Sequence, residues 1–152
     1  PLIRDCHENV IVEDLGAESL VEDDDFNDPA LAVAKAVAGD KYSFGVLLCG
    51  SAHGVCMQAN RIKGARAINA STPESVKVGR EDDHANILCL SADELDVDAM
   101  EKLIKTLCHT HPKMEERYTR RVKRLDAEHA KVSGGIEFSL KFGGDEEDDE
   151  EE

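Results

Sequence analysis

The sequence predicts an α/β protein with a three-layer, Rossmann-like arrangement, in which a parallel sheet carries helices on both faces. Short apolar runs alternate with segments of helical periodicity along the chain, and this alternation is typical of strands joined by crossover helices. The run 44–49 is apolar at every position but its glycine, and the run 86–91 has an apolar centre between Asn86 and Ser91. Such runs suit parallel strands that are buried on both faces.

Local signals place the elements in order. An apolar run closed by a glycine predicts a strand over 9–16. Asn27 or Asp28 followed by Pro29 is typical of a helix start, and the alanine-rich segment after it predicts a helix up to Gly39. Further strands are expected at 44–49, 65–70 and 86–91, and further helices at 54–62, 72–81 (with Thr72 as its N-cap), 97–108 and 113–130.

The helix expected over 97–108 is amphipathic. Its apolar residues recur three and four positions apart, so they should form one buried stripe. Pro112 ends this helix and separates it from the highly charged helix that follows. The stripe consists of Val97, Met100, Leu103, Ile104 and Leu107.

Charge divides the chain into a domain and a tail. The formal net charge is −15, and the last eight residues, 145–152, are all acidic. A run of this kind is typical of a solvated, disordered end. We therefore expect one folded domain over 1–132 and a glycine-containing acidic tail over 133–152. So acidic a chain is not expected to bind nucleic acid, because phosphate backbones require clustered Lys and Arg.

Cysteine usage and hydropathy bear on location. Five cysteines without a CxxC pair fit reduced thiols better than a disulfide scaffold. No apolar run approaches the roughly 18 residues of a membrane span. We therefore expect a cytoplasmic protein that does not contact a membrane. The segment 108–111 alternates cysteine, histidine and threonine, but residues two apart do not share a helix face, so no metal site is expected.

Cys49 is the strongest candidate for chemistry. It ends a predicted buried strand and precedes a loop of small residues, Gly50 to Gly54, that leads into a predicted helix. Ligands of open α/β sheets bind at the carboxyl ends of the strands, and a helix N-terminus favours the ionised form of a nearby thiol. Without further evidence, a buried core cysteine is the alternative interpretation.

Several segments resemble, in order and spacing, the type B ribose-5-phosphate isomerases, which share a fold with the galactose-6-phosphate isomerase subunits. They are DLG, DFNDPALAVAKAV, GVLLCGSAHGVCMQANRIKGARA, REDDHANILCLS and ERYTRRV. The resemblance covers roughly residues 1–125. It implies an aldose–ketose isomerase that interconverts ribose 5-phosphate and ribulose 5-phosphate through an enediolate, without a cofactor.

The resemblance also implies roles for individual residues. Cys49 matches the general base, Ser51 matches a hydroxyl near the sugar ring, and Arg117 and Arg121 match a phosphate clamp. In the family these arginines and the loop around Asp82 reach into the neighbouring subunit's site, so a homodimer, or a tetramer built from it, is implied. The remaining matched positions are Asp82 and His84 in the catalytic set, and Gly50, Ala52, His53, Gly54, Asn60, Asp83 and Phe26 in the substrate-binding set.

The chain departs from the family pattern in three places. It begins within what would be the family's first helix, so we expect a fragment that lacks the family's first strand. Asp82 and Asp83 replace a histidine and an amide, and His84 or His53 is a candidate to replace the histidine in opening the sugar ring. Ala52 replaces a glycine, which costs strain if that position needs a positive φ. The alternative functions are therefore a catalytically weakened partner subunit and an isomerase of a six-carbon sugar phosphate.

Overall fold

The structure, a computed structural model, describes residues 10–17, 19, 22, 24–41 and 43–133, with side chains up to residue 127. The strands and helices along these residues confirm the predicted α/β class. They are α1 (Asn27–Gly39), β1 (Gly45–Cys49), α2 (His53–Ala59), β2 (Ala67–Asn69), α3 (Pro73–Asp83), β3 (Ile87–Ser91), α4 (Val97–His109) and α5 (Glu116–Ser133).

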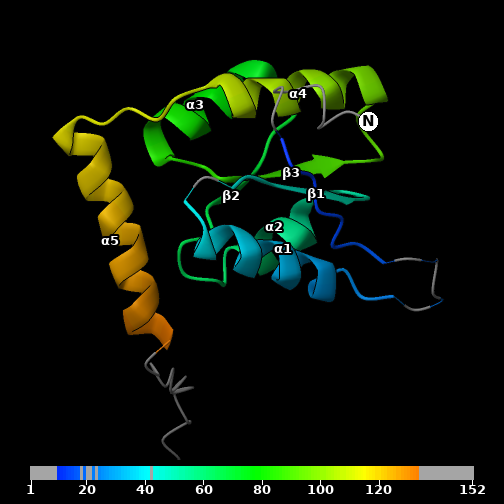
Figure 1. Ribbon diagram of the computed structural model, residues 1–152, viewed down its shortest axis with the longest axis horizontal. Coiled ribbons are helices and arrows are strands. Elements are labelled where there is room, and N and C mark those ends of the chain that lie inside the picture. The colour runs from blue at the N-terminus through cyan, green and yellow to red at the C-terminus, as the bar shows by residue number, and fades with distance from the viewer. Residues whose placement is uncertain (1–9, 18, 20–21, 23, 42, 134–152) are drawn as a thin grey trace, which may run out of the picture.

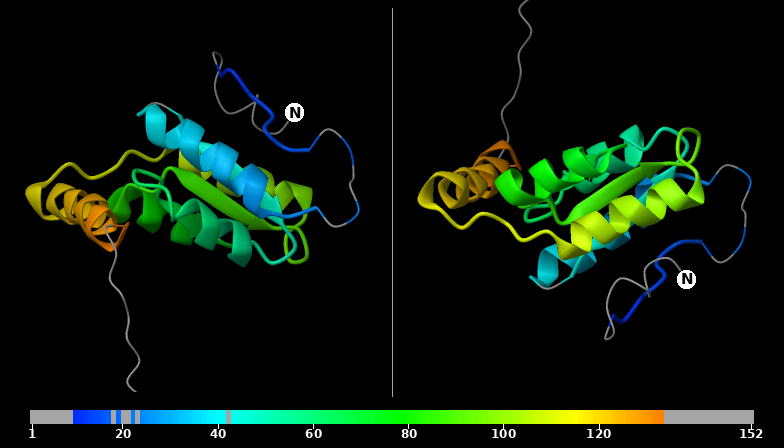
Figure 2. Two further views of the ribbon diagram at one scale, coloured as in Figure 1. Left: turned by 90° about the horizontal axis from the view of Figure 1, so that it is seen from below. Right: turned by 90° about the horizontal axis from the view of Figure 1, so that it is seen from above.

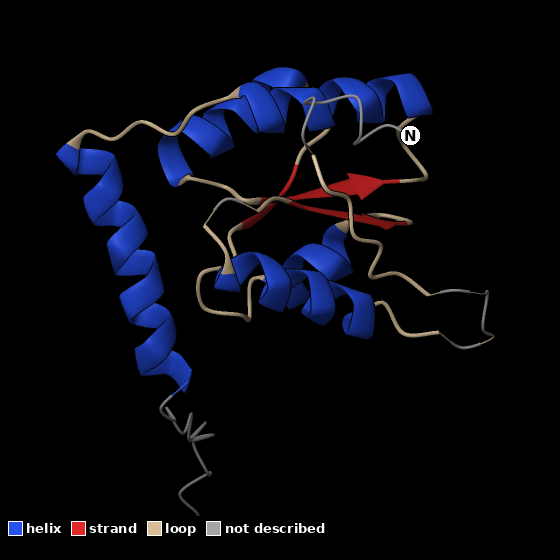
Figure 3. Ribbon diagram, viewed as in Figure 1, coloured by secondary structure: helices blue, strands red, loops and turns tan. Residues whose placement is uncertain are grey.

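The described sheet is parallel, with the strand order β1-β3-β2. Its register pairs Gly45 with Ile87 at one end of β1 and Cys49 with Ser91 at the other. Helices α1 and α2 cover one face and α3 and α4 the other, so the sheet is the middle of three layers (Figures 1 and 2). Helix α5 lies to one side of these layers, beyond the amino ends of the strands (Figure 3).

The central strand β3 separates two hydrophobic clusters, and all five of its residues are buried. Ile87 and Cys89 belong to the cluster under α1 and α2, whereas Leu88 and Leu90 belong to the cluster under α3 and α4. This alternation follows from the pleat, which points successive side chains to opposite faces. The continuous apolar run therefore correctly predicted a strand buried on both faces.

Two helix starts follow from capping side chains. Thr72 Oγ1 accepts a hydrogen bond from Ser75 N at 3.2 Å, and Asp96 caps α4 in the same way through Ala99 N at 2.8 Å. These bonds satisfy amide groups that have no partner within the helix. The expected cap of α1 is wrong: its N-cap position is Phe26, without a side-chain bond.

Three expectations about burial and pairing are also wrong. The sequence predicts a strand over 9–16, but residues 10–16, the part of this run that the structure describes, form no strand. Ile11 is 95% exposed, because no strand among the described residues pairs with this segment. Strand β1 is not buried on both faces, since it lies at an edge of the described sheet and Leu48 is 56% exposed. Val97 is 60% exposed and does not belong to the buried stripe of α4, because it lies in the first turn, next to the loop 92–96, in which every residue but Leu95 is exposed.

The acidic tail expected over 133–152 lies outside the described residues, except for Ser133, which ends α5. Within the part of the chain that is described, no helix combines the length and apolar character needed to cross a membrane.

Candidate functional site

Cys49 ends β1 at the carboxyl edge of the sheet, where the sequence predicted a site. The end of β3 holds the loop that follows. Ala92 N donates to Cys49 O at 2.9 Å, and Ser91 Oγ donates to Gly50 O at 2.7 Å. Cys49 is partly buried against the α1/α2 cluster. The thiol therefore lies at the edge of the hydrophobic core and directly precedes the loop. The carbonyl oxygens of Cys49 and Gly50 already accept hydrogen bonds from the end of β3.

The loop keeps a backbone conformation that favours glycine. Ala52 has φ 64° and ψ −5°, in the left-handed region, and is completely buried. For a residue with a Cβ this conformation costs about 1–2 kcal/mol. The sequence raised either strain or a changed loop at this position, and the structure shows a strained residue in the left-handed conformation. Among the described residues, no hydrogen-bond acceptor meets the backbone N–H groups of Ala52 and Gly54.

Phe26 packs against this loop. A Cβ added to Gly54 would lie 2.8 Å from Cζ of the Phe26 ring, so only glycine leaves room for that ring here. Phe26 itself is 45% exposed. The structure thus brings Phe26 and Gly54 together at the carboxyl edge of the sheet.

The side chains of Asn69 and His53 contact each other at the carboxyl edge of the sheet. Asn69, the last residue of β2, places its Nδ2 2.7 Å from His53 Nδ1 and 3.4 Å from Ser51 O. Ser51 Oγ accepts a long hydrogen bond of 3.4 Å from His53 N. Ser51, His53 and Asn69 are all exposed, so they form a polar rim beside the Cys49 loop.

The remaining acidic and basic candidates lie at the opposite edge of the sheet. Asp82 and Asp83 end α3 and His84 caps it, directly before β3 begins at Ile87. Ile87 pairs with Gly45, which is four residues before Cys49. At about 3.3 Å per residue, the strands separate these groups from Cys49 by roughly 13 Å. One chain therefore does not bring them to its own thiol.

Asp82 is paired within this opposite edge. Lys113 Nζ lies 2.7 Å from Asp82 Oδ1 and 3.1 Å from Glu81 Oε2. These hydrogen bonds raise the pKa of Lys113 well above its usual value. His84 adopts φ 54°, and its Nε2 donates to Lys113 O at 2.8 Å. The connection between α4 and α5 is thus tied to the end of α3, and Asp83 stays exposed.

Arg117 and Arg121 lie on α5 and are both exposed. The Arg117 guanidinium stacks on the Tyr118 ring at 4.7 Å, and Lys113 Nζ lies 5.2 Å from the same ring. Among the residues of this helix up to 127, Tyr118 and Val122 are buried, and the helix contacts α3. The two arginines therefore belong to the same edge as Asp82, His84 and the amino ends of the strands.

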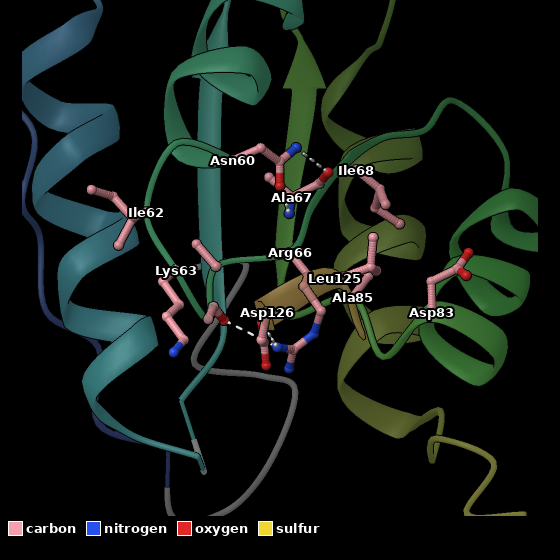
Figure 4. Close-up of a pocket in the computed structure, with 12 residues that line it drawn as sticks. Asn60, Ile62, Lys63, Arg66, Ala67, Ile68, Asp83, Ala85, Leu125 and Asp126 are labelled. Carbon is pink, nitrogen blue, oxygen red and sulfur yellow. Dashed lines mark hydrogen bonds and ion pairs between the residues drawn. The ribbon is translucent and has the colours of Figure 1, made fainter. Parts of the chain in front are cut away.

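The Asn60 side chain joins the end of α2 to β2. Its Oδ1 accepts from Ala67 N and its Nδ2 donates to Ala67 O, both at 2.8 Å, as the dashed lines in Figure 4 show. Both ends of the amide are thereby used to fasten the end of α2 to β2. Asn60 lies near the amino end of β2, away from the Cys49 loop of its own chain.

A pocket of about 340 Å³ opens beside the Asn60 side chain. It lies between the connection of α2 to β2, the end of α3 and α5 (Figure 4). Lys63, Arg66, Asp83 and Asp126 give it charges of both signs, and Arg66 Nη1 lies 3.8 Å from Asp126 Oδ1. Cys49 and its loop do not contribute to the pocket.

Two further thiols belong to the cluster against which Cys49 packs: Cys89 of β3 lies in it and Cys56 of α2 packs on it. Cys56 Sγ donates to Ala67 O at 3.4 Å. Interaction with the Cys89 thiol is the main cause that lowers the pKa of Cys56 to about 7, and burial opposes it. The same interaction and burial raise the pKa of Cys89. The described residues contain no group of three or more His, Cys, Asp or Glu side chains arranged to hold a metal ion.

Sequence reasoning missed Asn69, Ser91 and Lys113. Asn69 and Ser91 each end a strand at the same edge as Cys49, so a search for polar residues at strand ends would have found them. Lys113 had no such signal, because its partner Asp82 is 31 residues away in the sequence.

The fold and this loop define an α/β protein of Rossmann-like architecture, with a thiol and a polar rim at the carboxyl edge of its sheet. The family model described as Ribose/Galactose Isomerase matches residues 2–125. The chain therefore belongs to the ribose/galactose isomerase family.

Individual relatives agree with this assignment. A probable ribose-5-phosphate isomerase B of Mycoplasma pneumoniae is 40% identical over 81 residues, which are 53% of each chain. The chain spans about half the length of such curated relatives. The type B ribose 5-phosphate isomerase structure of Trypanosoma cruzi matches with a TM-score of 0.75 and 30% identity over 86% of both chains. The ribose-5-phosphate isomerase B of Mycoplasma genitalium, with bound ribulose-5-phosphate, matches with a TM-score of 0.71 and 29% identity over 77% of both.

Proposed function

We propose that the protein is an aldose–ketose isomerase that interconverts ribose 5-phosphate and ribulose 5-phosphate, with Cys49 as the general base. The observation that carries this proposal is the position of Cys49, at the carboxyl end of β1 and before the strained loop. Membership of the family and the names of its relatives support the reaction class. No metal or cofactor is part of the proposal.

In the proposed step, the Cys49 thiolate takes the proton from C2 of the open-chain aldose. The electrons of the C–H bond form a C1–C2 double bond, and the carbonyl pair moves to O1, which gives an enediolate. The Cys49 thiol then returns the proton to C1, the proton of the O2 hydroxyl passes to O1, and the ketone forms at C2. The backbone N–H groups of Ala52 and Gly54 donate to no acceptor among the described residues. They are therefore suited to stabilise negative charge on the substrate.

We further propose that the phosphate-binding residues come from a second copy of the chain. Arg117, Arg121 and Asp82 lie at the other edge of the sheet, roughly 13 Å along the strands from Cys49. In a two-fold dimer each site receives the same residues from its partner. A homodimer with shared sites would therefore complete both sites at once. The pairing of Asp82 with Lys113 also offsets one of the two negative charges that the sequence placed near the phosphate.

The general base is tested by comparing Cys49→Ala with the parent in ribose 5-phosphate turnover. Loss of the base should lower the rate on the order of 10²- to 10⁴-fold. Cys108→Ala, which changes a partly buried thiol of α4, is the matched control and should turn over at the parental rate. Equal rates for Cys49→Ala and the parent would rule out Cys49 as the base.

The shared site is tested by mixing subunits. Cys49→Ala and Arg121→Ala should each be inactive alone. Co-refolded in equal amounts, they should recover about one quarter of the parental activity, because half of the dimers are mixed and one of their two sites is intact. A mixture that stays inactive would show that Cys49 and Arg121 act within one chain.

One observation favours a second candidate, a binding subunit with weakened catalysis: Asp83 stays exposed without an ion-pair partner among the described residues. Such a protein would gain thermal stability from a phosphosugar without turning it over. Curated relatives also include a galactose-6-phosphate isomerase subunit and a D-erythrulose-4-phosphate isomerase. A panel of four-, five- and six-carbon sugar phosphates therefore belongs in the same assay.

A further inference from the structure

His53 is placed for chemistry by its own chain. It is the first residue of α2, four positions after Cys49, and its ring is exposed. Asn69 Nδ2, from the end of β2, lies 2.7 Å from His53 Nδ1. The imidazole is thus held at the carboxyl edge without help from a second subunit, unlike His84, which lies at the opposite edge and bonds to Lys113 O.

The contacts of Asn69 define which atoms of the pair face each other. Its Nδ2 also lies 3.4 Å from Ser51 O, and a carbonyl oxygen can only accept. A reversed amide would turn Asn69 Oδ1 toward this carbonyl and bring two acceptors together. The amide nitrogen therefore donates, and His53 Nδ1 accepts.

A neutral imidazole carries one proton, and the ring nitrogen that accepts leaves it on the other. His53 Nδ1 is the acceptor, so Nε2 carries the hydrogen. Among the described residues, this ring makes a polar contact only with Asn69. Its Nε2–H is therefore available to a bound molecule.

We propose that His53, held in this tautomer by Asn69, donates a hydrogen bond from Nε2–H to the enediolate oxygen that forms when Cys49 removes the C2 proton. The inference rests on the proposed isomerase function and gives it a catalytic residue, His53, and a positioning residue, Asn69. A neutral imidazole suits this task, because it polarises a carbonyl without giving up its proton. No proton is transferred to or from His53, so the proton transfers of the proposed isomerisation stay as described above.

The test is a double-mutant cycle on kcat/KM with the full chain and ribose 5-phosphate. His53→Ala should lower kcat/KM by roughly 10²- to 10³-fold, as expected for the loss of one oxyanion donor. His53→Gln, which keeps an N–H donor of similar reach, should retain more activity than His53→Ala. His111→Ala, at an exposed histidine between α4 and α5, is the matched control and should match the parent.

Asn69→Leu should lower kcat/KM by up to about 10²-fold in the parent, but should have no effect in the His53→Ala background. A positioning residue acts only through the group it positions, so the two losses should not add. If Asn69→Leu costs the same in both backgrounds, Asn69 does not act through His53. If His53→Ala stays within about threefold of the parent, the catalytic assignment of His53 is wrong.

A second readout does not depend on turnover. Long-range ¹H–¹⁵N NMR of the parent should show His53 Nδ1 without a proton, and Asn69→Asp, which offers an acceptor, should place a proton on Nδ1. A proton on Nδ1 in the parent would overturn the assigned tautomer. The two proposals fail differently: an inactive parent rejects the isomerase, whereas an active parent with a dead Cys49→Ala and an unaffected His53→Ala rejects only the role of His53.

Discussion

Asn60 offers a direct test of whether this asparagine serves stability or substrate binding. Its side chain makes two hydrogen bonds of 2.8 Å to the backbone of Ala67, and Ala67 is 8% exposed. At about 1 kcal/mol net for each bond, Asn60→Ala should lower the free energy of unfolding by about 2 kcal/mol. For a chain of this size that corresponds to a fall in Tm of roughly 4–8 °C.

Urea denaturation followed by circular dichroism measures this difference, since a lower midpoint with an unchanged slope reports stability alone. Met57→Ala is the control: it truncates a side chain of α2 that is 67% exposed and should cost less than about 0.5 kcal/mol. Asn60→Asp should be at least as destabilising as Asn60→Ala, because a carboxylate oxygen would face Ala67 O. The reasoning is refuted if Asn60→Ala unfolds at the parental midpoint and instead raises KM, which would make Asn60 a substrate ligand.

Two further predictions concern packing and ionisation. Gly45→Ala should destabilise by about 1–3 kcal/mol, because a Cβ there would lie 2.7 Å from Val33 Cγ1. Gly39→Ala meets nothing within 4 Å, so equal urea midpoints for the two variants would contradict the packing argument. Because the pKa of Cys56 is lowered to about 7, its alkylation by iodoacetamide should rise through pH 7. Cys89→Ala removes the main cause and should move this midpoint to higher pH, and an unchanged midpoint would show that the Cys89 thiol is not responsible.

The elements that the sequence predicted well are those set by local chemistry. Thr72 and Pro73 start α3 where a cap and a proline at the first helical position require it, and β3 is buried at every residue. Burial at the edges was less predictable, because it depends on what lies next to a strand. Leu48 and Leu90 each lie one residue before the end of an apolar run in the sequence. Leu48 is nevertheless exposed on the edge strand β1, whereas Leu90 is buried on β3.

The candidate site divides in the same way. The Cys49 loop is continuous in the sequence, so its position at a strand end could be predicted from the order of elements. The contact between Asn69 and His53 joins residues 16 apart, and that between Lys113 and Asp82 joins residues 31 apart. Neither pair has a spacing that indicates contact. Such pairs depend on the order of the strands in the sheet, which periodicity does not reveal.

The arrangement of the sheet explains why one chain holds two incomplete halves of the proposed site. All carboxyl ends of parallel strands lie at one edge, which carries Cys49, His53 and Asn69. The connections that return to the amino ends carry Asp82 and lead to Arg117 at the other edge. A flexible loop within one chain would have to cross the length of β1 to unite them. A two-fold axis that sets the carboxyl edge of one copy against the amino edge of the other unites them without moving either, so the proposed chemistry and the proposed dimer follow from the same geometry.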